Sequence, residues 1–550
     1  MKQIDLIAYL RYDVGMKEEI KKLIQKAAEE LKNRENWSDF VMPEIEVEYP
    51  KVEAFGDYSS NIAMVLGKVL KKNPMEVAEG IVRLLNDHIV EKEGNNFFEK
   101  IEAVRSGYLN FYLSQEFLQN KIEEINSLKE KYGDSQSGKG ERIHLDFVSA
   151  NPTGPVTLGN GRGGTLGDAL SNIFQKAGYS PWREYYVNDF GNQVKVLGHS
   201  VLKDGEAQYK GDYIDNLASR INSTDPFEVG QTAANIILEE IIKPSIEKMG
   251  IVFDEYFSEK SLHESGEVGK VFQDFIARDL FYEKDGAVWF RAEKFGDEKD
   301  RVVRKSTGEA TYFGGDIAYH KNKFDRGFQR VIDIWGADHH GDVKRVMGAV
   351  EALGFGGKLE IIITQLLRVV KDGKEFRMSK RKGTYVSIDD LLEEVGRDAV
   401  RFFFLMNSRD THMTFDLDLA KEKSEKNPVY YVQYAHARIC SILRKQEERN
   451  MKQENVDLSL LTHEKELSLA RELNKFPELV EEIVRTYEVH KLPYFAIKLA
   501  DKFHSMYNDL KVLDPEKPEL TAARLKLANA VRIVLAETLR LIGVSAPKRM

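Results

Sequence analysis

Residues 146–178 constrain the fold more than any other part of this 550-residue chain. They follow an apolar, β-favouring run over 143–148, and Pro152 and Pro155 then forbid regular structure. From about Gly161 the apolar side chains recur at helical spacing, so the order is strand, glycine-rich loop, helix. Glycines between 154 and 167 let a backbone approach a bulky anion closely, and a helix start offers it unpaired N–H groups. The pattern predicts a nucleotide-phosphate site.

The order of patterns along the chain predicts several domains, as a prior of about 150 residues per domain also suggests. The segments are an α+β unit (1–115), a charged helix and polar linker (116–140), an α/β domain (141–418) and a helical block (419–550). Strand, turn and helix recur over 179–198 and 330–354, which predicts a Rossmann-like parallel sheet with its ligand at the carboxyl ends of the strands. A mainly helical insertion, from about 200 to 300, is expected to end in a hairpin strand at 285–290.

Local signals also predict the elements of the first segment. Helical spacing marks 17–32 and 74–92, and alternating polarity marks strands at 45–50 and 108–113. A further helix is expected within 55–70, with Asp57 and Ser59 ahead of it as cap candidates.

Composition narrows the class of protein. No apolar run approaches the roughly 18 to 20 residues of a membrane span, and the first residues lack a secretory signal, so a cytoplasmic protein without a membrane partner is expected. The single cysteine, Cys440, excludes internal disulfides and a thiolate-rich zinc cluster. The net charge of −9 gives no global attraction to nucleic acid, so such a partner would need local basic patches.

The glycine-rich stretch admits a second interpretation. Gly159, Gly161 and Gly164 spell G-x-G-x-x-G, and Glu184 follows near the distance at which a dinucleotide fold carries its ribose acid. In that fingerprint the first glycine follows its strand almost directly, whereas residues 151–155 intervene here. An NAD-binding oxidoreductase therefore stays open only as a weaker alternative.

Two further segments carry candidate ligand groups. The turn after the strand at 330–336 contains Asp338, His339, His340 and Asp342. It could supply metal ligands, but a nucleotide-contacting turn is favoured because adjacent side chains seldom converge on one ion. Residues 377–382 carry four cationic side chains, and Gly383 allows this segment to move. A solvated basic loop is the ordinary reading, whereas a cationic element that reaches a phosphate chain explains the charge density better.

The helical block opens with an aromatic stripe that includes Tyr430, Tyr431 and Tyr434, with Arg438 beside it. Such a stripe is more often core than a base-stacking platform, and only a nucleic-acid partner would favour the second reading.

Together these segments resemble a known family. The sequence N-P-T-G-P-x-x-x-G-x-x-R-G after a strand, followed about 220 residues later by R-M-S-K-R-K-G, resembles the HIGH and KMSKS signatures of class I aminoacyl-tRNA synthetases. The resemblance is closest to the arginyl-tRNA synthetases and covers essentially the whole chain: residues 56–68 resemble their N-terminal tRNA-contacting domain, 311–320 their arginine-pocket motif and 543–550 their C-terminal ending.

The resemblance implies an arginine–tRNA ligase that uses ATP with Mg²⁺, needs no zinc, binds tRNA(Arg) through an all-α anticodon-binding domain and acts as a monomer. It implies catalytic roles for Thr157, Asn160 and Lys380. The implied arginine site comprises Asp146 and Asp316 on the guanidinium, Tyr312 beside it, Asn151 at the α-amino group, and Asn160. The implied ATP site comprises Pro155, Gly159, Gly161, Gly336, Asp338, His340, Met378, Ser379 and Lys380. The implied tRNA contacts include Asn61, Tyr434 and Arg438.

One departure from the family pattern bears on activity. Thr157 and Asn160 stand where the family usually has the two histidines of H-x-G-H. Both can donate a hydrogen bond, but neither becomes cationic near neutral pH. A working enzyme with a variant signature is favoured over a degenerate tRNA-binding relative, because the pocket candidates and Lys380 are retained together.

Overall fold

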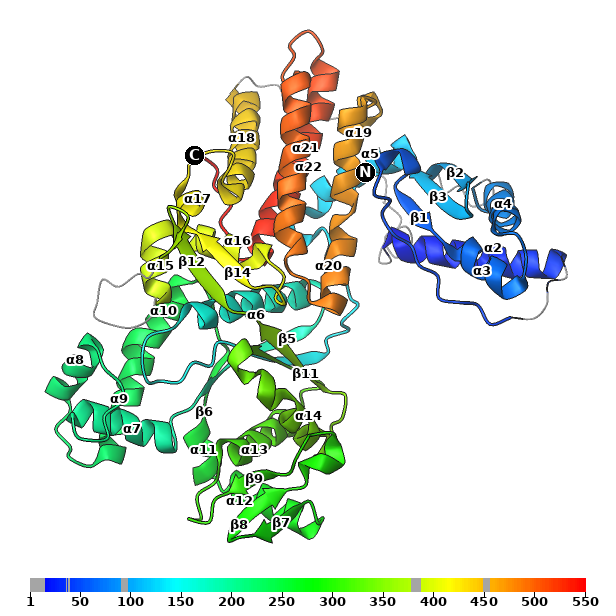
Figure 1. The fold of residues 1–550 in the computed structure, drawn as a ribbon. Helices are drawn as coiled ribbons and strands as arrows, with labels where there is room; N and C mark the ends of the chain where they lie inside the picture. The colour runs from blue at the N-terminus through cyan, green and yellow to red at the C-terminus, as the bar shows by residue number, and fades with distance from the viewer. Residues whose placement is uncertain (1–14, 36, 38–39, 91–96, 377–386, 449–455) are drawn as a thin grey trace.

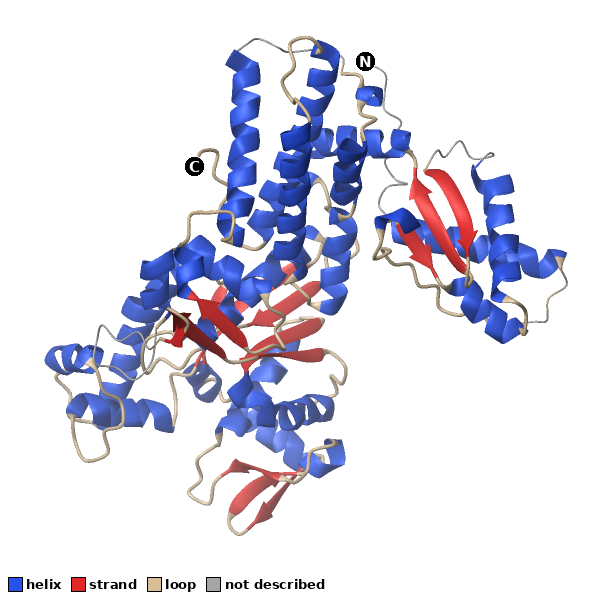
Figure 2. Cartoon of the chain, turned by 45° about the horizontal axis from the view of Figure 1, so that its top comes forward, coloured by secondary structure: helices blue, strands red, loops and turns tan. Residues whose placement is uncertain are grey.

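The computed structural model describes residues 15–35, 37, 40–90, 97–376, 387–448 and 456–550. Figure 1 shows an N-terminal α+β unit set to one side, a central α/β body and a column of long helices. Figure 2 shows this column standing on the body that holds most of the strands. The α/β fold class with a parallel sheet is confirmed, and so is the helical character of the last segment.

A five-stranded parallel sheet forms the centre of the body, in the order β11-β10-β4-β5-β6. The strands are β4 (Arg142–Asp146), β5 (Ser180–Val187), β6 (Glu255–Ser258), β10 (Arg330–Gly336) and β11 (Leu359–Thr364). The chain passes from β4 to β5 on one side and later returns to β10 on the other, so the strand order reverses between β4 and β10. Ligands of open α/β sheets bind in the crevice outside the carboxyl ends of the strands at such a switch point.

Helix α6 (Leu158–Lys176) follows β4. The helix begins at Leu158, three residues earlier than the start expected at about Gly161, so Gly159 also lies inside it and not in the loop before it. Three glycines of the helix permit close packing, because an added side chain would crowd a neighbour: Gly161 would meet Ile388, Gly164 would meet Val148 and Gly167 would meet Phe147. A side chain on Gly159 would meet only the Thr157 hydroxyl, at 3.8 Å, and otherwise open space.

The segment expected as an insertion contains β6, which pairs with β5 and therefore belongs to the central sheet. Its helices are α7 (Asn192–Leu202), α8 (Asp212–Arg220), α9 (Pro226–Ile237), α10 (Lys243–Lys248), α11 (Glu259–Glu264) and α12 (Glu267–Ala277). The hairpin strand expected at 285–290 is confirmed as β8 (Ala287–Phe290), which lies between β7 (Phe281–Lys284) and β9 (Arg301–Arg304). Helices α13 (Tyr312–Asp325) and α14 (Val343–Ala352) flank β10 in the sequence.

A smaller sheet and three helices connect the body to the column. They are β12 (Leu367–Lys371), β13 (Lys374–Glu375), β14 (Met413–Asp416), α15 (Ile388–Val395), α16 (Arg397–Met406) and α17 (Leu417–Lys421). The column consists of α18 (Pro428–Glu448), α19 (Glu464–Asn474), α20 (Phe476–Thr486), α21 (Lys491–Asp509) and α22 (Pro518–Leu541). Helix α5 (Gln115–Leu128), at the start of the expected linker, packs on the column, where Asn126 donates to the Lys526 carbonyl (3.1 Å). None of the described helices is long and apolar enough to cross a lipid bilayer.

The N-terminal unit contains α2 (Met16–Arg34), β1 (Tyr58–Ser60), α3 (Ile62–Leu70), α4 (Pro74–Leu84), β2 (Phe98–Val104) and β3 (Tyr108–Leu113). The strand expected at 45–50 is wrong, because only an isolated bridge between Glu48 and Ser59 forms there. The cap expected for α3 is also wrong: Asp57 accepts from the Leu113 N–H (2.8 Å), and Ser59 donates to Asn110 (2.9 Å). Both side chains serve the sheet instead of the helix.

Candidate active site

The start of α6 lies at the carboxyl end of β4 and is held by a capping box. Thr157 Oγ1 accepts from the Asn160 N–H (3.3 Å), and Asn160 Oδ1 accepts from the Thr157 N–H (3.3 Å) and from its hydroxyl (2.5 Å). The Thr157 hydroxyl hydrogen is therefore used within the box. Asn160 Nδ2 donates to the Val148 carbonyl (3.3 Å) and has a second hydrogen available. Of the two residues at the variant signature, Asn160 alone can still donate.

The open face of this helix start surrounds Gly159. The capping box occupies the N–H groups of Thr157 and Asn160, which leaves those of Leu158 and Gly159 without a partner in the helix, and Gly159 adds no side chain to cover them. Pro155, half-buried, precedes the turn. Gly161, also expected at the ATP site, instead faces Ile388, which would lie 2.7 Å from an added Cβ.

The chain that follows the cationic segment returns to the start of α6. Ser387 forms an antiparallel bridge with Thr157, and the Ile388 N–H donates to the Val156 carbonyl (3.0 Å). Met378, Ser379 and Lys380 lie outside the described residues. The first described residue after the cationic segment therefore lies beside the α6 start.

The polar turn after β10 borders the same crevice, because β10 pairs directly with β4. It begins at Gly336, where an added side chain would collide with Asp338, and it exposes Asp338 and His340 to solvent. His339 lies 3.4 Å from carboxylate oxygens of both Asp338 and Asp342. Within the described ranges no group of three or more metal-binding side chains occurs, at this turn or elsewhere.

Tyr312 and Asp316 lie one turn apart at the start of α13, which Thr311 caps by accepting from the Gly314 N–H (3.3 Å). The Tyr312 side chain is 45% exposed. Burial raises the pKa of Asp316 to about 6, and the negative charge of Glu259 adds to the rise while His320 opposes it. In the described part of the chain no lysine or arginine nitrogen lies within 4.0 Å of either carboxylate. His263 Nε2 lies 3.8 Å from Glu259 Oε1. Two carboxylates with which no lysine or arginine of the described residues pairs form a site suited to a cationic ligand.

The sequence interpretation missed two residues of this pocket. Glu259 directly follows β6, at the carboxyl end of a parallel strand, but lay inside the presumed insertion. Its Oε1 lies 3.1 Å from the position of a Cβ on Gly315, and its Oε2 accepts from the Asn188 amide (2.9 Å) in the orientation that satisfies both ends of that amide. Tyr186, on β5, has a buried hydroxyl without a protein partner. An unpaired buried hydroxyl is costly unless a ligand satisfies it.

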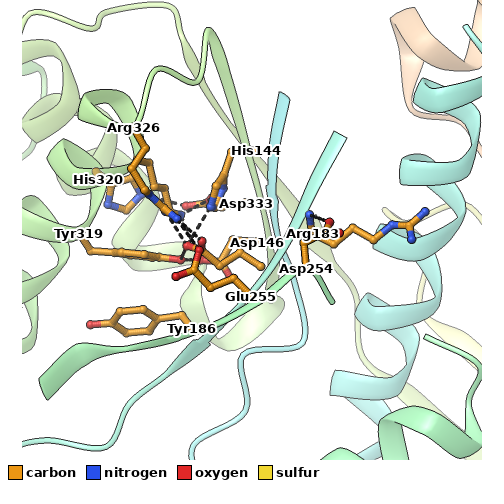
Figure 3. Close-up of polar contacts among 12 residues, drawn as sticks. His144, Asp146, Arg183, Tyr186, Asp254, Glu255, Tyr319, His320, Arg326 and Asp333 are labelled. Carbon is orange, nitrogen blue, oxygen red and sulfur yellow. Dashed lines mark hydrogen bonds and ion pairs between the residues drawn. The ribbon is translucent and has the colours of Figure 1, made fainter. Parts of the chain in front are cut away.

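Asp146 was expected to bind the guanidinium of arginine, but its carboxylate is already hydrogen-bonded within the protein. Asp146 is 6% exposed, and its oxygens already accept from Lys323 (3.0 Å), Tyr319 (3.0 Å) and Ser149 (2.5 Å). Figure 3 shows Asp146 within this buried polar group, with Tyr319 and Tyr186 on one side of it. Asn151, by contrast, is exposed and follows a turn in which Val148 has φ +68°, a strained conformation for a β-branched residue.

The structure removes the support for a dinucleotide site. Glu184, the candidate ribose acid, is fully buried and bound by Arg326 (2.6 Å) and Tyr319 (2.7 Å). Burial alone would raise the pKa of Glu184, but His144 (2.9 Å) and Arg326 hold it well below the usual range. Gly161 and Gly164 of the fingerprint lie inside α6 against Ile388 and Val148, so the dinucleotide pattern presents neither its glycine loop nor its ribose acid to a ligand.

The expected nucleic-acid contacts lie outside the body. Arg438 donates to the Tyr434 hydroxyl (2.7 Å) and lies over the rings of Tyr434 (4.6 Å) and Tyr507 (5.2 Å). His504, beside them, has its pKa lowered to about 4, by burial first and then by Arg438. Tyr434 is 36% exposed, so this face of α18 and α21 presents rings and a cation to solvent. Asn61 lies in the N-terminal unit and donates to Glu46 (3.4 Å).

Family models match three consecutive regions of the chain. Residues 18–113 match the arginyl tRNA synthetase N-terminal domain, residues 121–219 and 231–440 the class I (R) tRNA synthetase catalytic domain, and residues 432–550 the DALR anticodon binding domain.

Curated relatives and solved structures agree with these matches. The arginine–tRNA ligase of Carboxydothermus hydrogenoformans is 46% identical and covers 92% of this chain and 94% of its own length. That of Bacillus subtilis is 42% identical and covers 97% and 98%. Thermus thermophilus arginyl-tRNA synthetase superposes with a TM-score of 0.77 at 21% identity, over 97% of this chain and 100% of its own, and so shows the shared fold.

Proposed function

Because the chain belongs to the arginyl-tRNA synthetase family, we propose that it activates arginine with ATP and transfers the arginyl group to the 2′-OH of the terminal adenosine of tRNA(Arg). One observation carries the choice of amino acid: the partly buried Asp316 and the buried Glu259 lie near Tyr312, and no lysine or arginine of the described residues pairs with either carboxylate. A guanidinium is a planar cation that suits two carboxylates. Mg²⁺ enters as part of the ATP substrate.

The chemistry needs no side-chain nucleophile. The arginine carboxylate attacks the α-phosphate of ATP, and pyrophosphate leaves, so the protein contributes position and charge stabilisation. Asp316 and Glu259 hold the guanidinium, and Asn151 binds the α-amino group. Asp146, already occupied by Lys323, supports the pocket instead of binding the guanidinium directly. Arginine then lies with its carboxylate toward the crevice between β4 and β10.

ATP occupies that crevice in our proposal. The Gly159 end of α6 receives the phosphates, where the unpaired N–H groups and the spare hydrogen of Asn160 point toward negative charge. The turn with Gly336, Asp338 and His340 contacts the adenosine. Lys380, with Met378 and Ser379, supplies the cation that the variant signature lacks. Thr157 keeps the helix start in place.

A degenerate tRNA-binding relative is the second candidate, and the exchange reaction separates the two. We expect arginine-dependent exchange of pyrophosphate into ATP to occur only with tRNA(Arg) present, as the family resemblance implies. Lysine and citrulline, tested as alternatives to arginine, probe the charge and shape of the pocket. Exchange that proceeds fully without tRNA would argue against this family assignment of function, and absence of exchange under all conditions would favour the degenerate relative.

The affinity for arginine should fall as the pH is lowered through 6. The pKa of Asp316 is about 6, above its usual range, so its carboxylate is charged above this pH and becomes protonated below it. Between pH 7.5 and 5.5 the dissociation constant of arginine, measured by calorimetry with tRNA bound, should rise about fourfold. The ATP dissociation constant serves as the internal control. An arginine affinity that is flat or improves toward pH 5.5 would contradict the role of Asp316.

The aromatic face of α18 and α21 is proposed to contact the anticodon arm. Arg438→Ala removes a cation that lies over two rings, so the KM for tRNA should rise about tenfold while the KM for arginine at saturating tRNA stays unchanged. Arg278→Ala, at the C-cap of α12, removes an exposed arginine that pairs with Asp274 and should change neither value. Equal tRNA KM values for both variants would remove this face from the tRNA site. Asn61 stays a predicted tRNA contact, and a cytoplasmic monomer stays the expected form.

A further inference from the structure

Four acidic side chains form a row across the central sheet. Asp333 on β10 is paired in register with Asp146 on β4, Asp146 with Glu184 on β5, and Glu184 with Glu255 on β6. Register partners on neighbouring strands project to the same face, so the four carboxylates stand side by side. We call Asp333, Asp146, Glu184 and Glu255 the carboxylate row.

One face of α13 carries the groups that bind this row. Tyr319, His320, Lys323 and the C-cap residue Arg326 recur at helical spacing on the same helix as Asp316. Figure 3 shows Tyr319, His320 and Arg326 reaching toward the row. The contacts are Tyr319 to Asp146 (3.0 Å) and Glu184 (2.7 Å), His320 to Asp333 (2.9 Å), and Arg326 to Glu184 (2.6 Å) and Glu255 (2.9 Å).

Lys323 is the centre of these contacts. Its side chain is fully buried, and its Nζ donates to Asp146 (3.0 Å) and Asp333 (2.8 Å), whose side chains are 8% and 1% exposed. Burial alone would lower the pKa of Lys323, but the two carboxylates raise it above its usual value, so the side chain is a cation. Buried ion pairs add little net stability, yet they can fix one arrangement of the elements that carry them.

We propose that Lys323 is a positioning residue for arginine binding: by holding Asp146 and Asp333, it fixes α13 along the sheet and sets the distance from Asp316 to the switch-point crevice. This inference rests on the proposed function. Lys323 lies seven residues beyond Asp316, about 10 Å along the helix axis. A slide of α13 by one residue would move Asp316 by about 1.5 Å, close to the length that one methylene adds to a ligand. By fixing this position, the ion pairs of Lys323 set the length of the amino acid that fits between Asp316 and the crevice.

Lys323→Met tests whether these ion pairs select ligand length, with arginine and with homoarginine, which is one methylene longer, as substrates. We expect the KM for arginine to rise at least about tenfold and the preference for arginine over homoarginine in kcat/KM to fall at least about fivefold. The KM for ATP should stay within about threefold of wild type. Lys176→Met is the matched control, because Lys176 is also buried between two carboxylates, Asp134 (2.7 Å) and Glu537 (2.9 Å), outside the pocket. It should lower the melting temperature without changing the arginine preference.

Two further variants keep the test decisive if Lys323→Met folds poorly. The double variant Lys323→Met/Asp333→Asn restores charge balance, so it should recover the melting temperature but keep the high arginine KM and the weakened preference. Tyr319→Phe removes only the hydroxyl that donates to the carboxylate row, and it should raise the arginine KM about threefold to tenfold. Tyr132→Phe is its control, because it loses a buried hydrogen bond to the Leu473 carbonyl (3.2 Å) and should leave the arginine KM unchanged. Recovery of both properties in the double variant, or equal effects of the two tyrosine variants, would overturn the proposal. Absence of exchange in the wild type would instead refute the proposed function.

Discussion

Asp316→Asn should raise the KM for arginine at least about 100-fold, while the KM for ATP changes less than about threefold. The substitution preserves the size of the side chain and removes the charge that faces the guanidinium, so Glu259 would hold the ligand alone. Amino-acid-dependent exchange, measured with tRNA present and with each substrate varied in turn, gives both values. Asp325→Asn is the matched control, because Asp325 lies on the same helix and pairs with Lys321 at its surface. Parallel increases in the two KM values would show that Asp316 does not recognise arginine.

The same substitution should stabilise the ligand-free protein. The folded-state pKa of Asp316, about 6, exceeds its unfolded value near 3.8, so the unfolded chain ionises this group more easily and the charge disfavours folding above pH 6. Asp316→Asn should then raise the free energy of unfolding by on the order of 1–3 kcal/mol at pH 8, and the gain should vanish toward pH 4. Urea unfolding at the two pH values measures the difference. A destabilised Asp316→Asn at pH 8 would mean that a cation of the protein already compensates this carboxylate.

Local periodicity predicted the strand and the helix beside the site, but not the packing roles of particular residues in them. The strand before Pro152 and the helix after it were visible because each buries an apolar face within one window of sequence. The glycines of α6 were misread, because the neighbours that require them, Phe147 for Gly167 and Ile388 for Gly161, are recognised only once the chain is folded. Spacing alone cannot separate a glycine that admits a phosphate from one that admits a side chain.

The pocket acids show the same limit more sharply. Asp316 could be found through its family motif, and Glu259 could not, because β6 is only four residues long and lies between helices. A short edge strand gives almost no periodic signal, and its register beside β5 depends on the complete sheet. Asp146 was a reasonable candidate on sequence, yet its partner Lys323 lies 177 positions away. A carboxylate can bind a ligand only if no cation from another part of the sequence already pairs with it.

The geometry of the switch point joins the two substrates in our proposal. The chain places the α6 start after β4 and the Asp338 turn after β10, so neighbouring parallel strands deliver both to one edge. The acidic groups lie on the other side of β4, because Glu259 directly follows β6. An arginine that spans from β6 toward β4 would meet ATP with its carboxylate leading, which is the orientation that attack on the α-phosphate requires.

Lys380→Ala should lower the rate of arginine-dependent exchange at least about 100-fold, equivalent to about 2.7 kcal/mol of transition-state stabilisation. The expected cause is the loss of positive charge at the phosphates, which the variant signature cannot replace because the Thr157 hydroxyl is bonded to Asn160. Ser387 is bonded beside Thr157, so residue 380 is seven positions from a fixed point at the α6 start. The KM for arginine should stay within about threefold, since the acidic pocket is untouched.

Lys382→Ala provides the control for Lys380→Ala, because it removes the same charge from the same cationic run, two positions further on. We expect less than about a fivefold loss of rate from it, since a side chain that only adds to the surrounding potential contributes less than one that contacts the reacting phosphates. Lys380→Arg should recover part of the rate, because it restores the charge with a different shape. Equal losses of rate for Lys380→Ala and Lys382→Ala would show that the cationic run only attracts ATP by its general charge. Near-normal exchange in Lys380→Ala would show that the Gly159 end of α6 stabilises the phosphates without Lys380.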